Sequence, residues 1–520
     1  MENFTEQYKE KIIGVLHGFD HIVIKGYISR FYIDKSFYYF ISKEGCLLKA
    51  YKDYVQRKTE ELKKHIEKIA EETNCYKVFL SSSEIEKGEI AKKILEENPQ
   101  KEGLLCILSA VEPCYAITVR KNPASGMLER KREYRKCTHY YFYYNDRDFG
   151  LMFVKLQSWL PYTIKISLNF KEYLKKQLEK KEIKYKSYKN SITEVEDISK
   201  AQQLASRVVE KKWHQVFDNF AKKINPFTEH IEEITGHIAY SWCIENCEYA
   251  TDILFKDRES LQQIYPKLVE YASLCQLGEN IFTFFGRKLH PSYKGEAVSD
   301  RKNWQQGFRV KFTMNKNSIK MYDKYSVLRI ETTINNPGAF KVQKQGKWLP
   351  MGKSISNLYR IAEVSHKCNE RYIESLAQVK NINPLDKEIE SLSNPKVIKL
   401  SDKNVNARHY SSFNLLRDFS CKLFNAITNG AFYIKGFTRK EITEVLIKLK
   451  AFSEEEVVNM KKLLAKVTRL LCKLRAHGLI TKFPKTFKYR VTKKGQEIIS
   501  RILLFKKIEL WRFLPEVKVC

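Results

Sequence analysis

The chain lacks the long apolar segments that membrane insertion or export would require. It contains no run of roughly 18 apolar residues, which is the length that a transmembrane helix needs. The first residues, MENFTEQYKEK, carry charges where a signal peptide has an apolar core. We therefore expect a soluble, cytoplasmic protein with no membrane partner.

Cysteine pairs at the spacing of metal ligands are missing as well. The 12 cysteines stand singly, and the closest pair, Cys243 and Cys247, has no second pair to complete a zinc site. We expect reduced thiols that are mostly buried. His139 and the pair His230 and His237 also match no metal motif, so packing or hydrogen bonding is their favoured role.

The chain lacks a glycine loop of the kind that cradles phosphate, which argues against an ATP-driven motor.

Acidic residues are scarce near the C-terminus. Residues 461–507 hold about fifteen Lys and Arg but only one acid, Glu497. The whole chain has 93 Lys and Arg against 61 Asp and Glu, a net charge of +32. A polyanion is the usual partner of such a charge, so we expect DNA, with structured RNA as an alternative and acidic lipid or a merely solvated surface less favoured.

The length of 520 residues exceeds what one hydrophobic core usually organises, so several domains are expected. The patterns predict a multidomain protein of mixed α/β and α+β class. The predicted segments are an α/β domain at 1–120, an antiparallel hairpin with charged helices at 121–230, a central α+β domain at 231–400 and a basic domain at 401–520.

Strands and helices alternate in the first of these segments. Strands are predicted at 21–28, 76–80 and 104–109, and helices at 55–72 and 84–97.

A basic patch then leads into a hairpin rich in aromatic residues. The patch contains Arg130, Lys131, Arg132, Arg135 and Lys136. The alternating stretches 139–144 and 151–168 should pair around a turn, and their rings could stack on the bases of a single strand, although most are expected in the core. Asn169 should then cap a helical region that ends before Asn225-Pro226.

The basic C-terminal segment has clear helix signals. Thr438-Arg-Lys-Glu441 is a capping box. A helix at 454–476 should bury Leu464, Val467, Leu471 and Leu474 and carry a stripe of cations, Lys462, Lys466, Arg469 and Lys473, on another face. Strands at 479–483 and 487–491 and a closing helix at 494–504 should follow.

This order of elements resembles the winged helix-turn-helix domains of bacterial regulators. The resemblance is strongest in Leu474-Arg-Ala-His-Gly-Leu-Ile480 and Tyr489-Arg-Val-Thr-Lys-Lys-Gly495. It implies that the cation stripe enters the DNA major groove and that the wing contacts the DNA backbone. The implied wing residues are Lys482, Lys485 and Lys488, and Arg490 is a further candidate for nucleic-acid binding. A winged helix that contacts protein is the alternative.

The central segment 317–333 alternates like two strands around a turn at Tyr325-Ser326. In that register Tyr322 faces Arg329 and Lys320 faces Glu331 on one polar face. A tyrosine nucleophile that attacks DNA phosphate needs such cations for the transition state and often a metal held by carboxylates. The segment resembles a strand pair of rolling-circle replication initiators and relaxases, which implies that Tyr322 is catalytic. The alternative is a basic sheet face that contacts the nucleic-acid backbone.

Carboxylates elsewhere in the centre suggest a metal site. Asp252, Asp300 and Glu331 would hold Mg²⁺ or Mn²⁺ if they met at strand ends, as the acids of RNase H-like nucleases do. Asp20, expected just before the first strand, and Glu296 are further candidates. Ordinary turn and capping chemistry explains any one of these acids equally well.

The chain as a whole resembles uncharacterised bacterial proteins that combine Gly18-Phe-Asp20, Lys320-Met-Tyr-Asp-Lys324 and a terminal winged helix. This resemblance favours a protein carried by a mobile element. The resulting prediction is a nucleic-acid-binding protein that cuts and joins the DNA of a mobile element or plasmid as a metal-dependent nuclease. The alternatives are a non-enzymatic RNA-binding component of a nucleoprotein and a transcription regulator.

Overall fold

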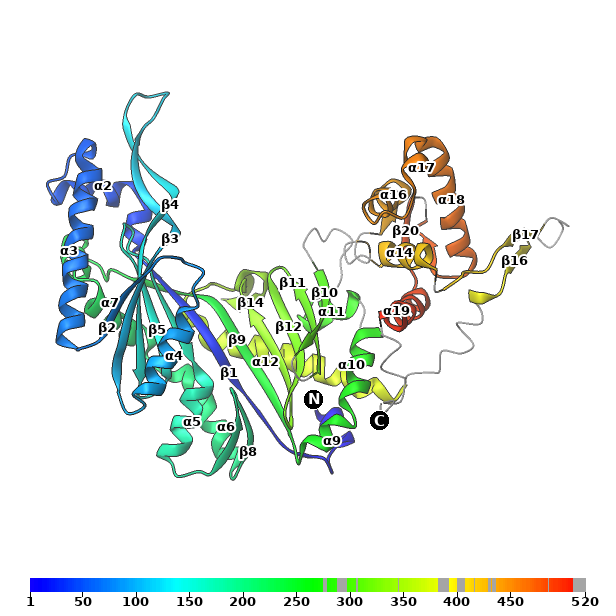
Figure 1. Cartoon of the computed structure of the whole chain (residues 1–520), viewed down its shortest axis with the longest axis horizontal. Coiled ribbons are helices and arrows are strands. Elements are labelled where there is room, and N and C mark those ends of the chain that lie inside the picture. The colour runs from blue at the N-terminus through cyan, green and yellow to red at the C-terminus, as the bar shows by residue number, and fades with distance from the viewer. Residues whose placement is uncertain are drawn as a thin grey trace, which may run out of the picture. The chain divides into compact units, whose positions relative to one another are not determined.

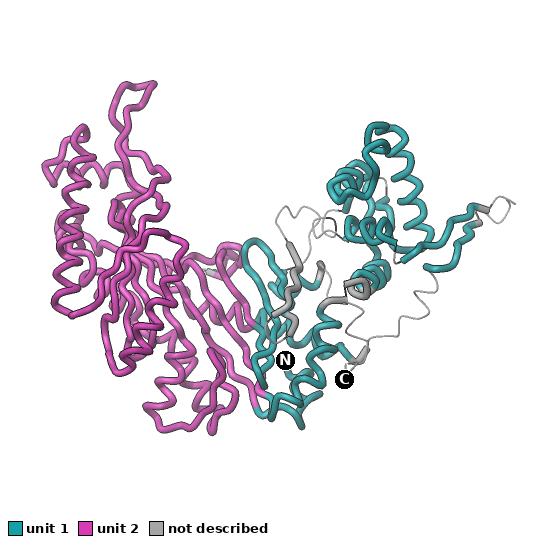
Figure 2. The backbone as a smooth tube through the Cα atoms, in the orientation of Figure 1, with its two compact units in different colours: residues 1–13, 255–330, 367–520 teal, residues 14–254, 331–366 magenta. Residues whose placement is uncertain are grey.

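The computed structural model describes most of the chain. The described residues are 1–274, 278–287, 297–304, 307–344, 346–381, 392–399, 407–415, 417–428, 432, 436–484 and 486–507. They form two compact units, each discontinuous in sequence (Figure 2). Unit 1 comprises 1–13, 255–330 and 367–520, and unit 2 comprises 14–254 and 331–366. The four predicted domains are consecutive segments of the chain, so they do not correspond to these two units, each of which is made of separate segments.

The architecture is mixed α and β, as the sequence predicts, and contains one large mixed sheet. Its strand order is β10-β11-β12-β13-β9-β1-β6-β5-β4-β3-β2. The strands are β1 Ile12–Tyr27, β2 Tyr76–Leu80, β3 Gly103–Lys121, β4 Leu128–Asp146, β5 Gly150–Gln157, β6 Ile164–Asn169, β9 Ser241–Phe255, β10 Ala297–Trp304, β11 Gly307–Met314, β12 Asn317–Lys324 and β13 Val327–Ile334. β2 pairs with β3 in parallel, whereas β3, β4, β5, β6 and β1 pair in antiparallel fashion (Figure 1).

The two faces of the sheet in unit 2 differ because successive side chains alternate. One row of directly opposed residues is apolar and almost fully buried, namely Ile24, Ile166, Val154, Phe142 and Ile107. The helix α3 (Tyr51–Glu72) packs against β3, and its Tyr51 hydroxyl donates to the Ile117 carbonyl at 3.1 Å. The next row, one residue along each strand, therefore faces the opposite side.

A long two-stranded arm is built from β3 and β4. The two strands pair from Gly103 opposite Asn145 to Lys121 opposite Leu128. In the described registers, β5 pairs only with 139–146 of β4, and β2 only with 106–110 of β3. Residues 111–121 and 128–138 therefore continue as a ribbon beyond the neighbouring strands, which Figure 1 shows. We call this ribbon the arm.

Several predicted elements of unit 2 are confirmed and others need correction. The hairpin around 146–150 is present as β4 and β5, but 151–168 divides into β5 and β6 because residues 158–163 interrupt it. Asp20 lies inside β1, not before the first strand, because β1 begins at Ile12.

The stretch predicted to be helical after Asn169 is also divided. The Asn169 side chain accepts from the amides of Lys171 and Glu172, which confirms the predicted cap. A small hairpin interrupts the helices that follow. The elements are α5 Phe170–Lys180, β7 Tyr185–Tyr188, β8 Ser191–Val195, α6 Ile198–Ser206 and α7 Trp213–Ile224, and Asn225 ends α7 as predicted.

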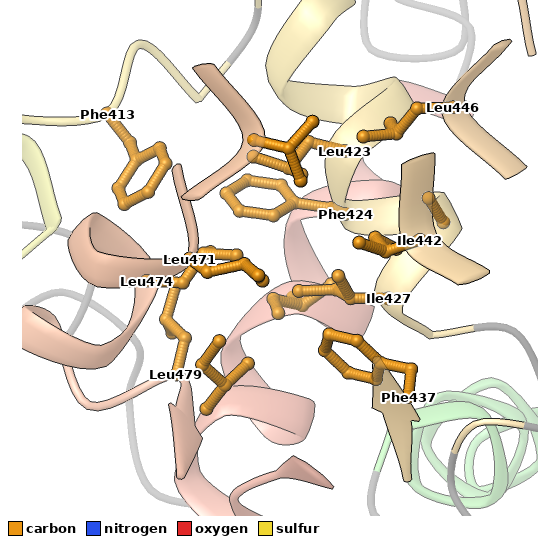
Figure 3. Close-up of a cluster of buried hydrophobic side chains, with 14 of the residues drawn as sticks. Phe413, Leu423, Phe424, Ile427, Phe437, Ile442, Leu446, Leu471, Leu474 and Leu479 are labelled. Atoms are coloured by element: carbon orange, nitrogen blue, oxygen red, sulfur yellow. The ribbon is translucent and has the colours of Figure 1, made fainter. Parts of the chain in front are cut away.

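The C-terminal module, which we define as the described part of 407–507, belongs to unit 1. Its main elements are α14 Asp418–Ile427, β18 Phe437–Thr438, α16 Arg439–Lys448, α17 Glu454–Val458, α18 Met460–Ala476, β19 Ile480–Lys482, β20 Lys488–Val491 and α19 Lys493–Lys507. The three strands form a sheet in the order β18-β20-β19. Figure 3 shows the apolar core, in which Phe424 and Ile427 of α14 meet Leu471 and Leu474 of α18 and Phe437 of β18.

Sequence signals in this module are largely confirmed. Thr438 and Glu441 form the predicted capping box at the start of α16. The helix predicted over 454–476 is broken at Asn459, whose side chain caps α18. Leu463 is buried, while Leu464, predicted in its place, is only partly buried.

The remaining elements complete the two units. They are α1 Glu2–Gln7, α2 Asp34–Lys43, α4 Lys87–Glu97, α8 Thr228–Thr235, α9 Arg258–Gln262, α10 Tyr265–Leu274, α11 Gly278–Phe284, β14 Lys341–Lys344, β15 Lys347–Pro350, α12 Leu358–Leu376, β16 Lys396–Lys399 and β17 Ala407–Tyr410. Among the described helices, none combines the length and the apolar character that crossing a bilayer requires.

Candidate nucleic-acid interface

The helix α18 presents an exposed cationic face. Leu463, Val467 and Leu471 are buried against the core of the module, which directs other positions outward. Lys462 and Arg469 are exposed. They stand seven residues apart, about two helical turns, and therefore project on the same side of α18.

The other two predicted stripe residues are engaged within the module. Lys473 donates from Nζ to the Ser412 carbonyl at 2.8 Å and lies 4.2 Å from the ring centre of Phe413. Burial lowers the pKa of Lys473. Lys466 pairs with Glu456 and lies near the rings of Phe419 and Phe452. Both lysines thus stabilise the packing around α18, and Lys462 and Arg469 are the two stripe residues that project.

The turn between β19 and β20 adds exposed cations and an aromatic ring. The Phe487 side chain is 85 % exposed, and the ammonium of Lys482 lies 5.3 Å from its ring centre. Lys488 and Arg490 are exposed on β20. Lys485, also predicted to contact nucleic acid, lies outside the described residues.

The start of α16 lies beside α18 and is also basic. Arg439 and Lys440, the first two residues of α16, are exposed. Arg439 donates from Nη1 to the Thr468 hydroxyl of α18 at 3.3 Å. The two exposed side chains of Arg439 and Lys440 therefore extend the cationic surface of α18.

A second basic surface lies on unit 2. Lys25 of β1, Lys165 of β6 and Lys155 of β5 are directly opposed on neighbouring strands, on the face opposite the apolar row. Lys165 pairs with Glu245 at 2.6 Å, and Lys155 pairs with Glu112. Burial lowers the pKa of Lys25, and the charge of Lys165 lowers it further, while Glu245 opposes the shift. We call these three residues the lysine row.

The arm joins cations to exposed tyrosines. Tyr115 and Tyr134 are opposed across β3 and β4, are 53 % and 67 % exposed, and have ring centres 5.3 Å apart. The guanidinium of Arg132 lies 4.5 Å from the ring centre of Tyr115. Arg130 is paired with Asp34 at 2.6 Å, and Arg135 with Glu133 at 3.1 Å.

Sequence reasoning found the arginines of the arm but did not single out the two tyrosines. The sequence around each tyrosine alternates only weakly between apolar and polar residues, so it gives little signal of a strand. That Tyr115 and Tyr134 meet depends on the pairing of β3 with β4.

The residues predicted to be catalytic lie in buried surroundings. β12 and β13 are joined by Tyr325-Ser326, as expected, but both faces of β13 are buried. Tyr322 is 8 % exposed and Glu331 is 3 % exposed, and Arg329 is fully buried. Lys320 is partly buried. This part of the sheet presents no open polar face of the predicted kind in the described residues.

Asp252, predicted as a metal ligand, lies inside β9 and forms an ion pair with Lys171 at 2.8 Å. The side chain of Asp300, a residue of β10, lies outside the described residues. The predicted set of Asp252, Asp300 and Glu331 therefore stays a prediction, as does the Mg²⁺ or Mn²⁺ ion assigned to it. Within the described residues, three potential metal ligands converge instead at Cys114, Cys137 and His139.

Comparisons with protein-family models, curated proteins and solved structures gave no match to this chain. The functional proposal below therefore depends on the geometry and charge of the described residues.

Proposed function

We propose that this protein binds nucleic acid and that its C-terminal module reads duplex DNA in the manner of a winged helix. One observation carries the proposal. The module has the order helix α14, strand β18, helices α16, α17 and α18, and hairpin β19–β20, and it has exposed cations on α18 and on the hairpin. A winged helix places its last helix before the hairpin in the major groove, and α18, about 25 Å long, fits that role.

The exposed residues divide into two kinds of contact in this arrangement. Lys462 and Arg469 of α18 face the groove, where arginine and lysine can reach guanine edges or phosphates. Lys482 and Lys488 of the hairpin contact the backbone beside the groove. A protein partner is the alternative ligand, but a surface with this excess of cations fits a polyanion better.

Binding of the full-length chain to duplex DNA tests this proposal. We expect the double variant Lys462→Ala/Arg469→Ala to bind a fluorescent duplex about tenfold more weakly or worse at fixed moderate salt, because two cations leave the interface. The matched control is Lys448→Ala, an exposed lysine at the other end of α16, which should bind within about twofold of the wild type. Equal affinity of the double variant and the wild type would remove α18 as the reader.

A second candidate function is contact with single-stranded nucleic acid, including RNA, by unit 2. The arm favours it, because exposed tyrosines beside an arginine provide the stacking and the charge that single strands require. The lysine row adds three cations to this unit, of which Lys155 and Lys165 are paired with Glu112 and Glu245.

Cutting and joining of DNA for a mobile element stays a prediction. The burial of Tyr322 and Glu331 and the ion pair at Asp252 do not favour catalysis by these side chains in the described conformation. The proposal is therefore limited to binding.

A further inference from the structure

Cys114, Cys137 and His139 form a buried cluster at the foot of the arm in unit 2. Cys114 lies on β3, and Cys137 and His139 alternate on β4, so that all three side chains share one face. The two sulfurs are 2.9 Å apart, and the Cys137 sulfur is 4.0 Å from Nδ1 of His139. One ligand atom from each residue lies within 4.8 Å of the others, and all three residues are buried. This convergence is the arrangement that a small cation needs.

The backbone contact of His139 indicates which ring nitrogen is available to a metal ion. Nδ1 lies 3.2 Å from the carbonyl oxygen of Cys137, and in the tautomer that donates this hydrogen bond the free lone pair is on Nε2. A metal ion would displace the thiol protons of the two cysteines.

We propose that Cys114, Cys137 and His139 bind one divalent cation of the zinc class, which ties β3 to β4 where the arm leaves the sheet. Two sulfurs and an imidazole nitrogen are ligands that Zn²⁺ prefers, whereas Mg²⁺ and Mn²⁺ prefer oxygen. Three protein ligands leave one tetrahedral position for water. This site differs in residues and in metal from the carboxylate site that the sequence suggests.

The strand register favours a metal over a disulfide. Cys114 is opposite Arg135 and Cys137 is opposite Glu112, so the two cysteines are diagonal neighbours. Diagonal neighbours have Cα atoms about 7–8 Å apart, which exceeds the roughly 4.4–6.8 Å of most disulfides. A zinc ion with bonds of about 2.3 Å to each sulfur would hold the sulfurs somewhat farther apart than their present 2.9 Å, whereas a disulfide would draw them to about 2.05 Å.

The surroundings of the cluster are consistent with a structural role. Trp159 packs against Cys114 and Cys137 and shields them. Two thiolates would neutralise the charge of the ion, which lowers the cost of holding it in a buried place. The ion would fix the start of the ribbon that carries Tyr115 and Tyr134.

Cobalt titration of the full-length protein tests the site. Reduced protein kept in a phosphine reductant is titrated with Co²⁺ alone, without nucleic acid, so that the result is independent of the proposed function. We expect one Co²⁺ per chain, with thiolate-to-cobalt absorption in the near ultraviolet and the visible bands of a tetrahedral site. Added Zn²⁺ should abolish these bands.

Variants assign the signal to the cluster. Cys137→Ala should weaken Co²⁺ binding by at least about tenfold. The matched control is Cys106→Ala, because Cys106 is buried on the same strand β3 but lies outside the cluster. Circular dichroism checks that each variant is folded, and His139→Ala replaces Cys137→Ala if the latter is not.

Two results would overturn the proposal. One is folded wild-type protein that shows no cobalt–thiolate absorption at excess Co²⁺. The other is a control variant that loses the signal as completely as the cluster variants. A Cys114–Cys137 disulfide found by mass spectrometry, together with no metal binding after reduction, would assign the pair to redox chemistry instead.

Discussion

At the scale of single residues, the ion pair of Asp252 and Lys171 places two opposite charges deep inside unit 2. Their side chains are 1 % and 4 % exposed. Desolvation makes such a pair costly to form, but removal of one partner is costlier because it leaves a buried charge uncompensated. Substitution of either Asp252 or Lys171 should therefore strongly destabilise unit 2.

Replacement of Asp252 tests the contribution of this pair. We expect Asp252→Asn to reduce the free energy of unfolding by about 3–5 kcal/mol, because Lys171 loses its counter-charge. The measurement is urea unfolding of the full-length chain. The control is Glu194→Gln, which breaks the exposed pair of Lys186 and Glu194 and should cost less than about 1 kcal/mol. Equal small losses in both variants would contradict the role given to Asp252.

His17 predicts a pH effect at the same scale. Burial, together with the nearby His366 and Lys171, lowers the pKa of His17 to about 4. The unfolded chain takes up a proton near pH 6.5, and the folded chain only near pH 4, so stability falls as the pH drops between these values. The full difference corresponds to about 3 kcal/mol.

The variant His17→Gln isolates this effect. It should lose less stability than the wild type between pH 7 and pH 4.5, as followed by urea unfolding at each pH. His139 titrates in both proteins, so its contribution cancels in the difference. Parallel pH profiles for the two proteins would show that His17 is not held neutral by the fold.

At the scale of elements, local signals in the sequence predict local structure well. The capping box of Thr438 and Glu441, the cap at Asn169 and the strand 76–80 are all present as predicted. Each depends on neighbours within a few residues, which a sequence pattern records. The break at Asn459 was missed because the apolar spacing of the two helices continues across it.

The length of the arm could not be predicted in the same way. Residues 111–121 and 128–138 alternate only weakly, and their strand structure depends on mutual pairing.

The cation stripe of α18 also depends on contacts that the local sequence does not reveal. Its periodicity is visible in the sequence, but the partners of Lys473, Ser412 and Phe413, come from a segment about 60 residues earlier.

The arm supports a prediction that separates it from the C-terminal module. We expect Arg132→Ala/Tyr134→Ala to weaken binding of single-stranded RNA about tenfold or more, because stacking and charge are both lost. Binding of duplex DNA should stay within about twofold. Separate titrations with a labelled duplex and with a labelled single strand measure the two affinities.

The matched control for this experiment is Met127→Ala, an exposed residue in the connection between β3 and β4. It should leave both affinities unchanged. Loss of duplex and single-strand binding in equal measure in the arm variant would contradict a separate role for the arm.

At the scale of the whole molecule, the sequence predicts the class of fold but not its connectivity. In the large sheet, β1 lies between β9 and β6, strands that are far from it in sequence. The units are likewise discontinuous. The cluster of Cys114, Cys137 and His139 escaped prediction for the same reason, because its cysteines are 23 residues apart and meet only through the register of β3 and β4.

The salt dependence of DNA binding tests the central claim most directly. A cationic interface releases counterions, so the logarithm of the binding constant falls linearly with the logarithm of salt concentration. If Lys462, Arg469, Lys482, Lys488 and Arg490 all contact phosphate, the slope should be about −4 to −5. Lys462→Ala/Arg469→Ala should reduce its magnitude by about 2. A slope near zero, or one that is unchanged in the double variant, would contradict the account.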